Sequence, residues 1–119
     1  MLAWHAALNA GDVPRLLDLS TADVEVGGPR GVGRGADLLR DWVDRAQIHL
    51  EPGRLVHDGA TVVVEETAAW RAAESGQMGS GQPVATVFSV VDGRVARAVR
   101  YPDLEAALQA AGVSAARDG

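Results

Sequence analysis

Hydrophobic residues in the first part of the chain repeat every three or four positions, the spacing of an amphipathic helix. Residues 1–8 form the first such segment, which ends at an Asn-Ala-Gly sequence because glycine accepts the left-handed conformation that closes helices. A second short helix follows, with Asp12 as its N-cap and Pro14 in its first turn. Residues 23–26 alternate as a strand does, and the strongest helical stripe then runs over residues 38–46.

From about residue 47 the pattern changes to that of β-strands joined by tight turns. The Asp-Gly pairs at 58–59 and 92–93 are two-residue hairpin signals, because such turns favour residues that tolerate positive φ. A last helix begins after Asp103 and ends at Gly112. The predicted strands are residues 48–56, 60–71, 83–91 and 94–101, with a loop rich in Gly, Ser and Gln at 73–82.

Helices followed by a run of hairpin-linked strands are typical of an α+β fold, in which an antiparallel sheet has helices packed on one face. The sequence contains neither an internal repeat nor a linker, so residues 1–119 are predicted to form a single domain. Residues 113–119 are expected to be a frayed tail.

Composition and charge exclude several classes of function. Eleven basic residues, all of them arginine, face sixteen acidic ones, so we expect no nucleic-acid partner. Cysteine is absent, and the three histidines lack metal-ligand spacing, so no metal site is predicted. No apolar run approaches the roughly 18 residues of a membrane span. The first residues lack the features of a signal peptide, and a cytoplasmic protein is therefore expected.

Four short motifs together resemble a known family. Residues 4–12 read Trp-His-Ala-Ala-Leu-Asn-Ala-Gly-Asp, close to an aromatic-x-x-x-x-Asn-x-Gly-Asp opening. The strand at 23–26 is followed by a Gly-Pro turn, and an Arg-Gly pair at 34–35 enters the next helix. Residues 92–103 run from Asp-Gly-Arg-Val to Arg-Tyr-Pro-Asp. In this order the motifs resemble the nuclear-transport-factor-2-like superfamily, which includes SnoaL-like proteins and ketosteroid isomerases.

The resemblance implies a cone-shaped, curved antiparallel sheet with the N-terminal helices packed on its concave face. It also implies a hydrophobic pocket between helices and sheet, which is the default site for a small molecule. Proteins of this family commonly pair through the outer sheet face, so we expect a homodimer. Val62, Val64 and Val87 are the apolar residues expected on that outer face.

The comparison with ketosteroid isomerase is specific enough to test residue by residue. That enzyme uses a carboxylate base and an oxyanion hole made of a tyrosine and a protonated aspartate. The resemblance places Gly28 at the base position, Trp4 at the tyrosine and Thr86 at the aspartate, so the isomerase mechanism is not expected here. The same positions are expected to line the pocket, although Trp4 is equally consistent with a core aromatic. The predicted ligand-binding residues are Trp4, Trp42, Thr86, Phe88, Arg100 and Tyr101.

Acid–base candidates are few. Glu65 and Glu66 adjoin on one strand, so one of the two is expected to face inward, and Glu65 is the choice because it shares a face with Val63. His49 lies on a strand and is a second catalytic candidate. Arg100, rather than Arg97, is expected to face the pocket, where a guanidinium could hold a carboxylate or enolate.

The sequence leaves three hypotheses for function, of which one is an accessory subunit whose sheet face mediates association, and the other two concern the pocket. The first is a small-molecule-binding SnoaL-like protein with a hydrophobic pocket and no assignable reaction. The alternative is a cofactor-free isomerase, cyclase or hydrolase that acts on a hydrophobic polycyclic or polyketide-like substrate. The glycine-rich segment 27–35 lacks the lysine and the spacing of nucleotide-binding loops, so we interpret it as a turn and expect no cofactor.

Overall fold

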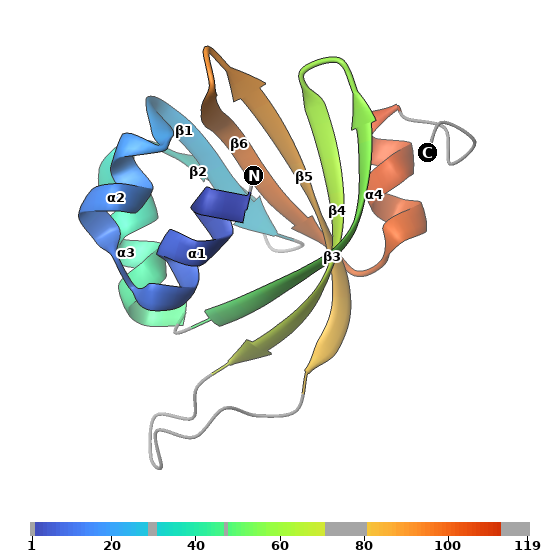
Figure 1. Cartoon of the computed structure of the whole chain (residues 1–119), viewed down its shortest axis with the longest axis horizontal. Coiled ribbons are helices and arrows are strands. Elements are labelled where there is room, and N and C mark those ends of the chain that lie inside the picture. The colour runs from blue at the N-terminus through green and yellow to red at the C-terminus, as the bar shows by residue number, and fades with distance from the viewer. Residues whose placement is uncertain (1, 29–30, 47, 71–80, 113–119) are drawn as a thin grey trace.

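The computed structural model describes residues 2–28, 31–46, 48–70 and 81–112, which form helices on both sides of a curved sheet (Figure 1). The predicted tail and most of the loop predicted at 73–82 lie outside these residues. The elements, in chain order, are α1 (Leu2–Ala10), α2 (Val13–Asp18), β1 (Ser20–Gly28), β2 (Gly31–Arg34), α3 (Ala36–Ala46), β3 (Ile48–Asp58), β4 (Thr61–Trp70), β5 (Gln82–Val91), β6 (Arg94–Tyr101) and α4 (Leu104–Ala111).

The predicted caps are confirmed. The Asp12 carboxylate accepts a hydrogen bond from the Arg15 N–H, and the Asp103 carboxylate accepts one from the Ala106 N–H, so each closes the first turn of its helix. Gly112 ends α4 in the left-handed conformation. The glycine-rich segment is more than a turn, because its second half forms the short edge strand β2.

The six strands follow the order β2-β1-β6-β5-β4-β3. Every neighbouring pair is antiparallel except β1 and β6, which run parallel. The predicted α+β fold with an antiparallel sheet and N-terminal helices packed on it is therefore confirmed, and the parallel β1–β6 pair is a feature that the sequence did not predict. A parallel pair needs a long crossover, and the chain between β1 and β6 supplies one by passing through α3 and four strands.

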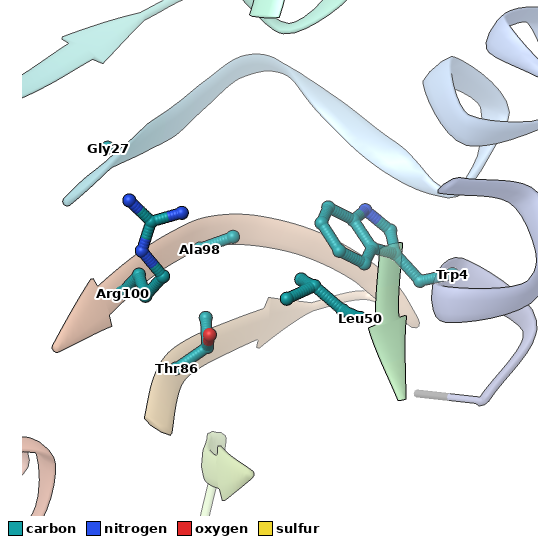
Figure 2. Close-up of a pocket in the computed structure, with 6 residues that line it drawn as sticks. All are labelled: Trp4, Gly27, Leu50, Thr86, Ala98 and Arg100. Atoms are coloured by element: carbon teal, nitrogen blue, oxygen red, sulfur yellow. The ribbon is translucent and has the colours of Figure 1, made fainter. Parts of the chain in front are cut away.

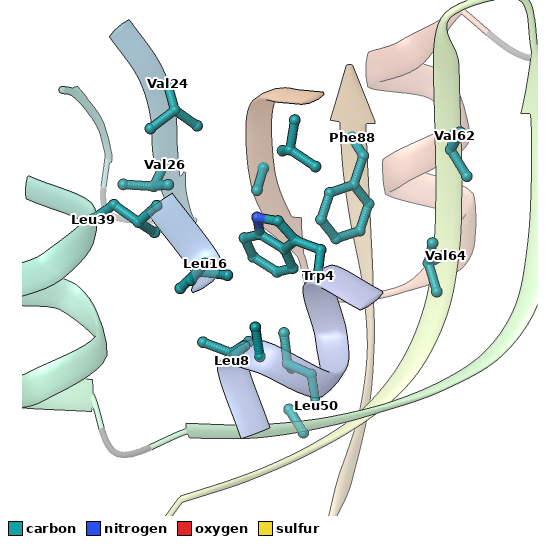
Figure 3. Close-up of a cluster of buried hydrophobic side chains, with 14 of the residues drawn as sticks. Trp4, Leu8, Leu16, Val24, Val26, Leu39, Leu50, Val62, Val64 and Phe88 are labelled. Atoms are coloured by element: carbon teal, nitrogen blue, oxygen red, sulfur yellow. The ribbon is translucent and has the colours of Figure 1, made fainter. Parts of the chain in front are cut away.

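Helices cover both faces of the sheet, not one. The sheet curves around α1, α2 and α3, while α4 packs on the opposite face (Figure 1). Trp4 and Phe88 lie at the centre of the larger cluster of buried side chains on the first face (Figure 3). A smaller cluster, including Val63, Val87 and Leu108, lies beneath α4. None of the helices in the described part of the chain has the length and hydropathy that crossing a bilayer requires.

The burial of both faces corrects our choice of dimer residues. Val62 and Val64 belong to the inner cluster, and Val87 is buried beneath α4 on the opposite face. All three side chains are therefore covered within one chain. Because helices cover both faces of the sheet, β4 and β5 carry buried apolar side chains on both faces. The homodimer stays a prediction, but it cannot use these residues as its contact surface.

Asn9 fastens α1 to the edge strand β3. Its side-chain amide donates to the Leu50 carbonyl at 2.9 Å, and its amide oxygen accepts from the Leu50 N–H at 2.8 Å. We expect Asn9→Ala to lower the free energy of unfolding by about 1–3 kcal/mol, because two part-buried backbone groups lose their partners. Urea denaturation measures the change. Asn9→Asp keeps an acceptor and loses the donor, so its free energy of unfolding should lie between those of the wild-type protein and Asn9→Ala. Equal stability of all three proteins would contradict this role of Asn9.

Candidate functional site

A small cavity lies between α1 and the inner face of the sheet. Its volume is about 10 Å³, room for about one water molecule. Figure 2 shows the Trp4 ring at one end, the Arg100 guanidinium at the other, and Leu50 and Ala98 between them. The lining residues are Trp4, Gly27, Leu50, Thr86, Ala98 and Arg100.

The sheet register brings the polar lining residues together. Thr86 on β5 lies directly opposite Arg100 on β6, and Phe88 lies opposite Ala98. Residues two apart on a strand share a face, so these four side chains are on the inner face with the N-terminal helices. Three of the six predicted ligand-binding residues, Trp4, Thr86 and Arg100, are therefore brought to one cavity.

Arg100 supplies the positive charge of the cavity. Its half-burial lowers the pKa of the guanidinium, and the nearby Glu66 carboxylate acts in the opposite direction. An arginine remains protonated in proteins, so Arg100 is a partly desolvated cation. Gly28 borders it: a Cβ at this glycine would lie 3.4 Å from the Arg100 Nη2. Gly28, which the family resemblance places at the position of the ketosteroid isomerase base, thus lies beside the Arg100 guanidinium.

Thr86 contributes a buried hydroxyl. Thr86 is 4% exposed, and its Oγ1 makes no hydrogen bond with any of the described residues. Buried polar atoms are nearly always hydrogen-bonded, so an unpaired hydroxyl in a cavity wall is a place where water or a ligand binds.

A buried pair, His5 and Glu66, lies on the same face. The His5 Nε2 is 3.0 Å from the Glu66 Oε1, and their side chains are 2% and 0% exposed. With Glu66 as a carboxylate, which only accepts hydrogen bonds, the Nε2 of His5 is the donor in this contact. The second carboxylate oxygen, Oε2, is buried without a hydrogen-bond partner among the described residues.

Glu66, not Glu65, faces inward. Glu66 alternates with Val64 and Val62 of the inner cluster, whereas Glu65 shares its face with Val63, which packs beneath α4. Glu65 and Glu66 both line a more open groove of about 400 Å³, together with Glu51. The sequence did not resolve this choice, because Val62, Val63 and Val64 are all apolar and fix no inner face.

The ring of Trp4 lines the cavity, whereas its indole N–H is hydrogen-bonded within the protein. The indole nitrogen donates to the Ser20 hydroxyl at 3.1 Å, and Ser20 in turn donates to the Leu16 carbonyl at 2.8 Å. The ring packs edge-on against Phe88, with 5.2 Å between centroids. Trp4 is therefore a core residue that also closes one end of the cavity.

The other predicted site residues lie elsewhere. Phe88 is fully buried behind Trp4 and does not line the cavity. Tyr101 packs with α4 on the opposite face. His49 pairs with Glu51 at 2.9 Å at the exposed edge strand. The Trp42 side chain lies outside the described part of the structure.

His5 is the residue of this pair to which sequence analysis gave no role, whereas Glu66 was considered and Glu65 was preferred to it. His5 shares a helical face with the buried Leu8 three positions on. Its partner is 61 positions away, a pairing that no local pattern predicts. Within the described ranges, no cluster of three or more histidine and carboxylate side chains could hold a metal ion.

Comparison with known proteins identifies the fold family. The sequence model of the SnoaL-like domain matches residues 1–98. No curated protein matches the sequence significantly. The solved structures described below share less than 25% identity with this chain, a level at which likeness shows the fold alone.

Three solved structures illustrate that likeness. One is a protein of ketosteroid-isomerase-like fold from Catenulispora acidiphila in complex with trimethylamine, with 19% identity, a TM-score of 0.72, and 97% of this chain and 93% of that chain covered. TerC, co-crystallised with polyporic acid, has 21% identity and a TM-score of 0.72, with 88% and 89% covered. An NTF2-like protein of unknown function from Cytophaga hutchinsonii has 14% identity and a TM-score of 0.71, with 84% and 83% covered.

Proposed function

Because this chain belongs to the SnoaL-like domain family, we propose that it binds a small, mainly apolar organic molecule through an acceptor oxygen of that molecule. The oxygen would lie in the cavity beneath α1, held by the Arg100 guanidinium and the Thr86 hydroxyl. Trp4, Leu50 and Ala98 would contact the apolar part of the ligand.

The buried Thr86 hydroxyl beside Arg100 is the observation that carries this proposal. Two donors meet in a cavity whose remaining walls are apolar, which is the usual composition of a small-molecule site. An oxygen that accepts from a guanidinium forms a charge-assisted hydrogen bond, stronger than a neutral one. A carboxylate, an enolate or a polarised carbonyl oxygen fits these two donors.

Size and the similar structures support the same proposal. The cavity of about 10 Å³ holds one oxygen-sized group, so the rest of a ligand would lie in its mouth or displace Leu50. Two similar proteins were solved with small molecules, namely polyporic acid and trimethylamine. The alternative considered from the sequence, a cofactor-free isomerase, cyclase or hydrolase, needs an inward acid–base group, and Glu66 is the carboxylate that could serve it.

Benzoate is a suitable probe for the test, since it combines a carboxylate with an apolar ring. We expect Arg100→Gln to weaken benzoate binding by about tenfold or more, because a hydrogen bond to a charged group contributes about 1.5–3 kcal/mol. Titration calorimetry, or NMR titration if binding is weak, measures the dissociation constants.

Arg97→Gln is the matched control. Arg97 is on the same strand, but it is exposed on the opposite face near Glu25, so its loss should leave benzoate binding unchanged. Equal affinity of the wild-type protein and the Arg100→Gln variant would contradict the proposed function.

A further inference from the structure

Glu66 has a hydrogen-bonding capacity that the protein does not use. His5 binds one carboxylate oxygen, while the other is buried and makes no hydrogen bond with the described residues. Leaving a charged group's oxygen unpaired in the interior costs more than the about 1–3 kcal/mol of a neutral group. The natural partner of this oxygen is a hydrogen-bond donor, which the described residues do not provide.

The carboxylate and the cavity donors lie on one face and close together. Thr86 on β5 lies opposite Arg100 on one side and opposite Val64 on the other, and Glu66 is the next inward residue after Val64 on β4. Glu66 and Arg100 are thus two strands and two residues along the strand apart, roughly 12 Å between their backbones. Their charges interact, as the effect of Glu66 on the Arg100 pKa shows.

Glu66 also adjoins the opposite side of the cavity. Leu50, which lines the cavity, is paired with Ala68, the next inward residue of β4 after Glu66. Thr86 and Leu50 of the cavity lining are therefore diagonal cross-strand neighbours of Glu66, whose direct partners are Val84 on β5 and Pro52 on β3.

We propose that Glu66 is the acceptor for a hydrogen-bond donor on the ligand, so that the site selects a small hydroxy acid or a comparable molecule with an acceptor oxygen at one end and a hydroxyl at the other. The acceptor oxygen binds to Arg100 and Thr86, and the hydroxyl donates to the Glu66 Oε2. His5 is a positioning residue, because its hydrogen bond to Oε1 fixes which oxygen faces the ligand. This inference rests on the proposed function and adds the chemical class of the ligand.

Substituted benzoates test the inference directly. For ring positions 3 and 4, the hydroxybenzoate is compared with the fluoro- and methoxybenzoates, which keep the acid but cannot donate. The compact fluorine controls for size, and the methoxy group controls for the electronic effect of oxygen. We expect the wild-type protein to bind one hydroxybenzoate about tenfold or more tightly than both counterparts, the range of a hydrogen bond to a charged group.

Glu66→Gln should abolish this preference. The glutamine carbonyl oxygen would keep the hydrogen bond from His5, and its NH₂ group would then replace Oε2 with a donor. We expect the ratio of dissociation constants to fall within about threefold of one. Glu65→Gln is the matched control, since Glu65 faces away from the cavity and its loss should leave the wild-type ratio unchanged.

The outcomes separate the two proposals. If benzoate binds in an Arg100-dependent manner but the wild-type protein shows no preference for a hydroxyl, water alone satisfies Glu66, and this inference is overturned while the proposed function stands. If no benzoate binds, or binding is independent of Arg100, both are overturned. The wild-type comparison decides the question even if Glu66→Gln does not fold, and a preference that survives in folded Glu66→Gln would also overturn the inference.

Discussion

Trp4→Ala is expected to lower the free energy of unfolding by about 3–5 kcal/mol, the range for removing a large aromatic side chain from a packed core. Trp4 is 2% exposed and lies at the centre of the inner cluster, edge-on to both Phe88 and His5 (Figure 3). The substitution would leave a void among these side chains and remove the indole donor from Ser20. Urea denaturation followed by circular dichroism measures the change.

Trp4→Phe separates packing from hydrogen bonding at this position. This variant retains an aromatic ring and loses the hydrogen bond to Ser20. The missing hydrogen bond alone should lower the free energy of unfolding by about 0.5–1.5 kcal/mol, a smaller loss than for Trp4→Ala. A loss below about 1 kcal/mol for Trp4→Ala itself would show that Trp4 is not the core residue described here.

His5→Leu is expected to destabilise the protein by about 3 kcal/mol, because the buried Glu66 carboxylate loses its hydrogen bond from His5, and an unsatisfied buried charged group costs more than the about 1–3 kcal/mol of a neutral one. The Glu66 carboxylate would lose the hydrogen bond to Oε1 while Oε2 already lacks one among the described residues. The double variant His5→Leu/Glu66→Leu should recover much of the loss, since it removes the charge together with its partner. Chemical denaturation of the four proteins gives the coupling energy.

The chain offers a matched control in the pair His49 and Glu51. Their contact distance of 2.9 Å is nearly that of the buried pair, but the side chains are 38% and 70% exposed. Exposed pairs contribute about 0–1 kcal/mol, so His49→Leu should have little effect. Similar small losses for His5→Leu and His49→Leu would contradict the view that burial makes the His5–Glu66 pair important.

Much of the fold could be predicted because its signals are local. The Asp92-Gly93 turn shows why: both residues have positive φ, 52° and 77°, as a two-residue hairpin turn of this kind requires. The N-caps Asp12 and Asp103 likewise act within three residues of their position. The parallel pairing of β1 with β6 was missed because it joins segments about 70 positions apart in the chain, as in the pair Val26 and Ala98.

The site was predicted less completely, for a related reason. Thr86 and Arg100 were found through the family's residue pattern and strand alternation, and the structure brings both to the cavity. The inward carboxylate was assigned to Glu65 because it shares a face with Val63, but the three preceding valines are apolar on both faces of β4 and do not identify the inner one. Only the packing of α4 on the outer face explains that pattern, and its position depends on the tertiary structure.

NMR mapping of benzoate on isotope-labelled protein tests the central claim most directly, namely that the cavity beneath α1 binds a small acid through Arg100 and Thr86. We predict that benzoate shifts the signals of the Thr86 methyl group, the Arg100 Nε–H and the Trp4 indole N–H. The signals of Tyr101 and Leu108, beneath α4, should stay in place. Shifts confined to the α4 side of the sheet, or no shifts at saturating benzoate, would contradict the account.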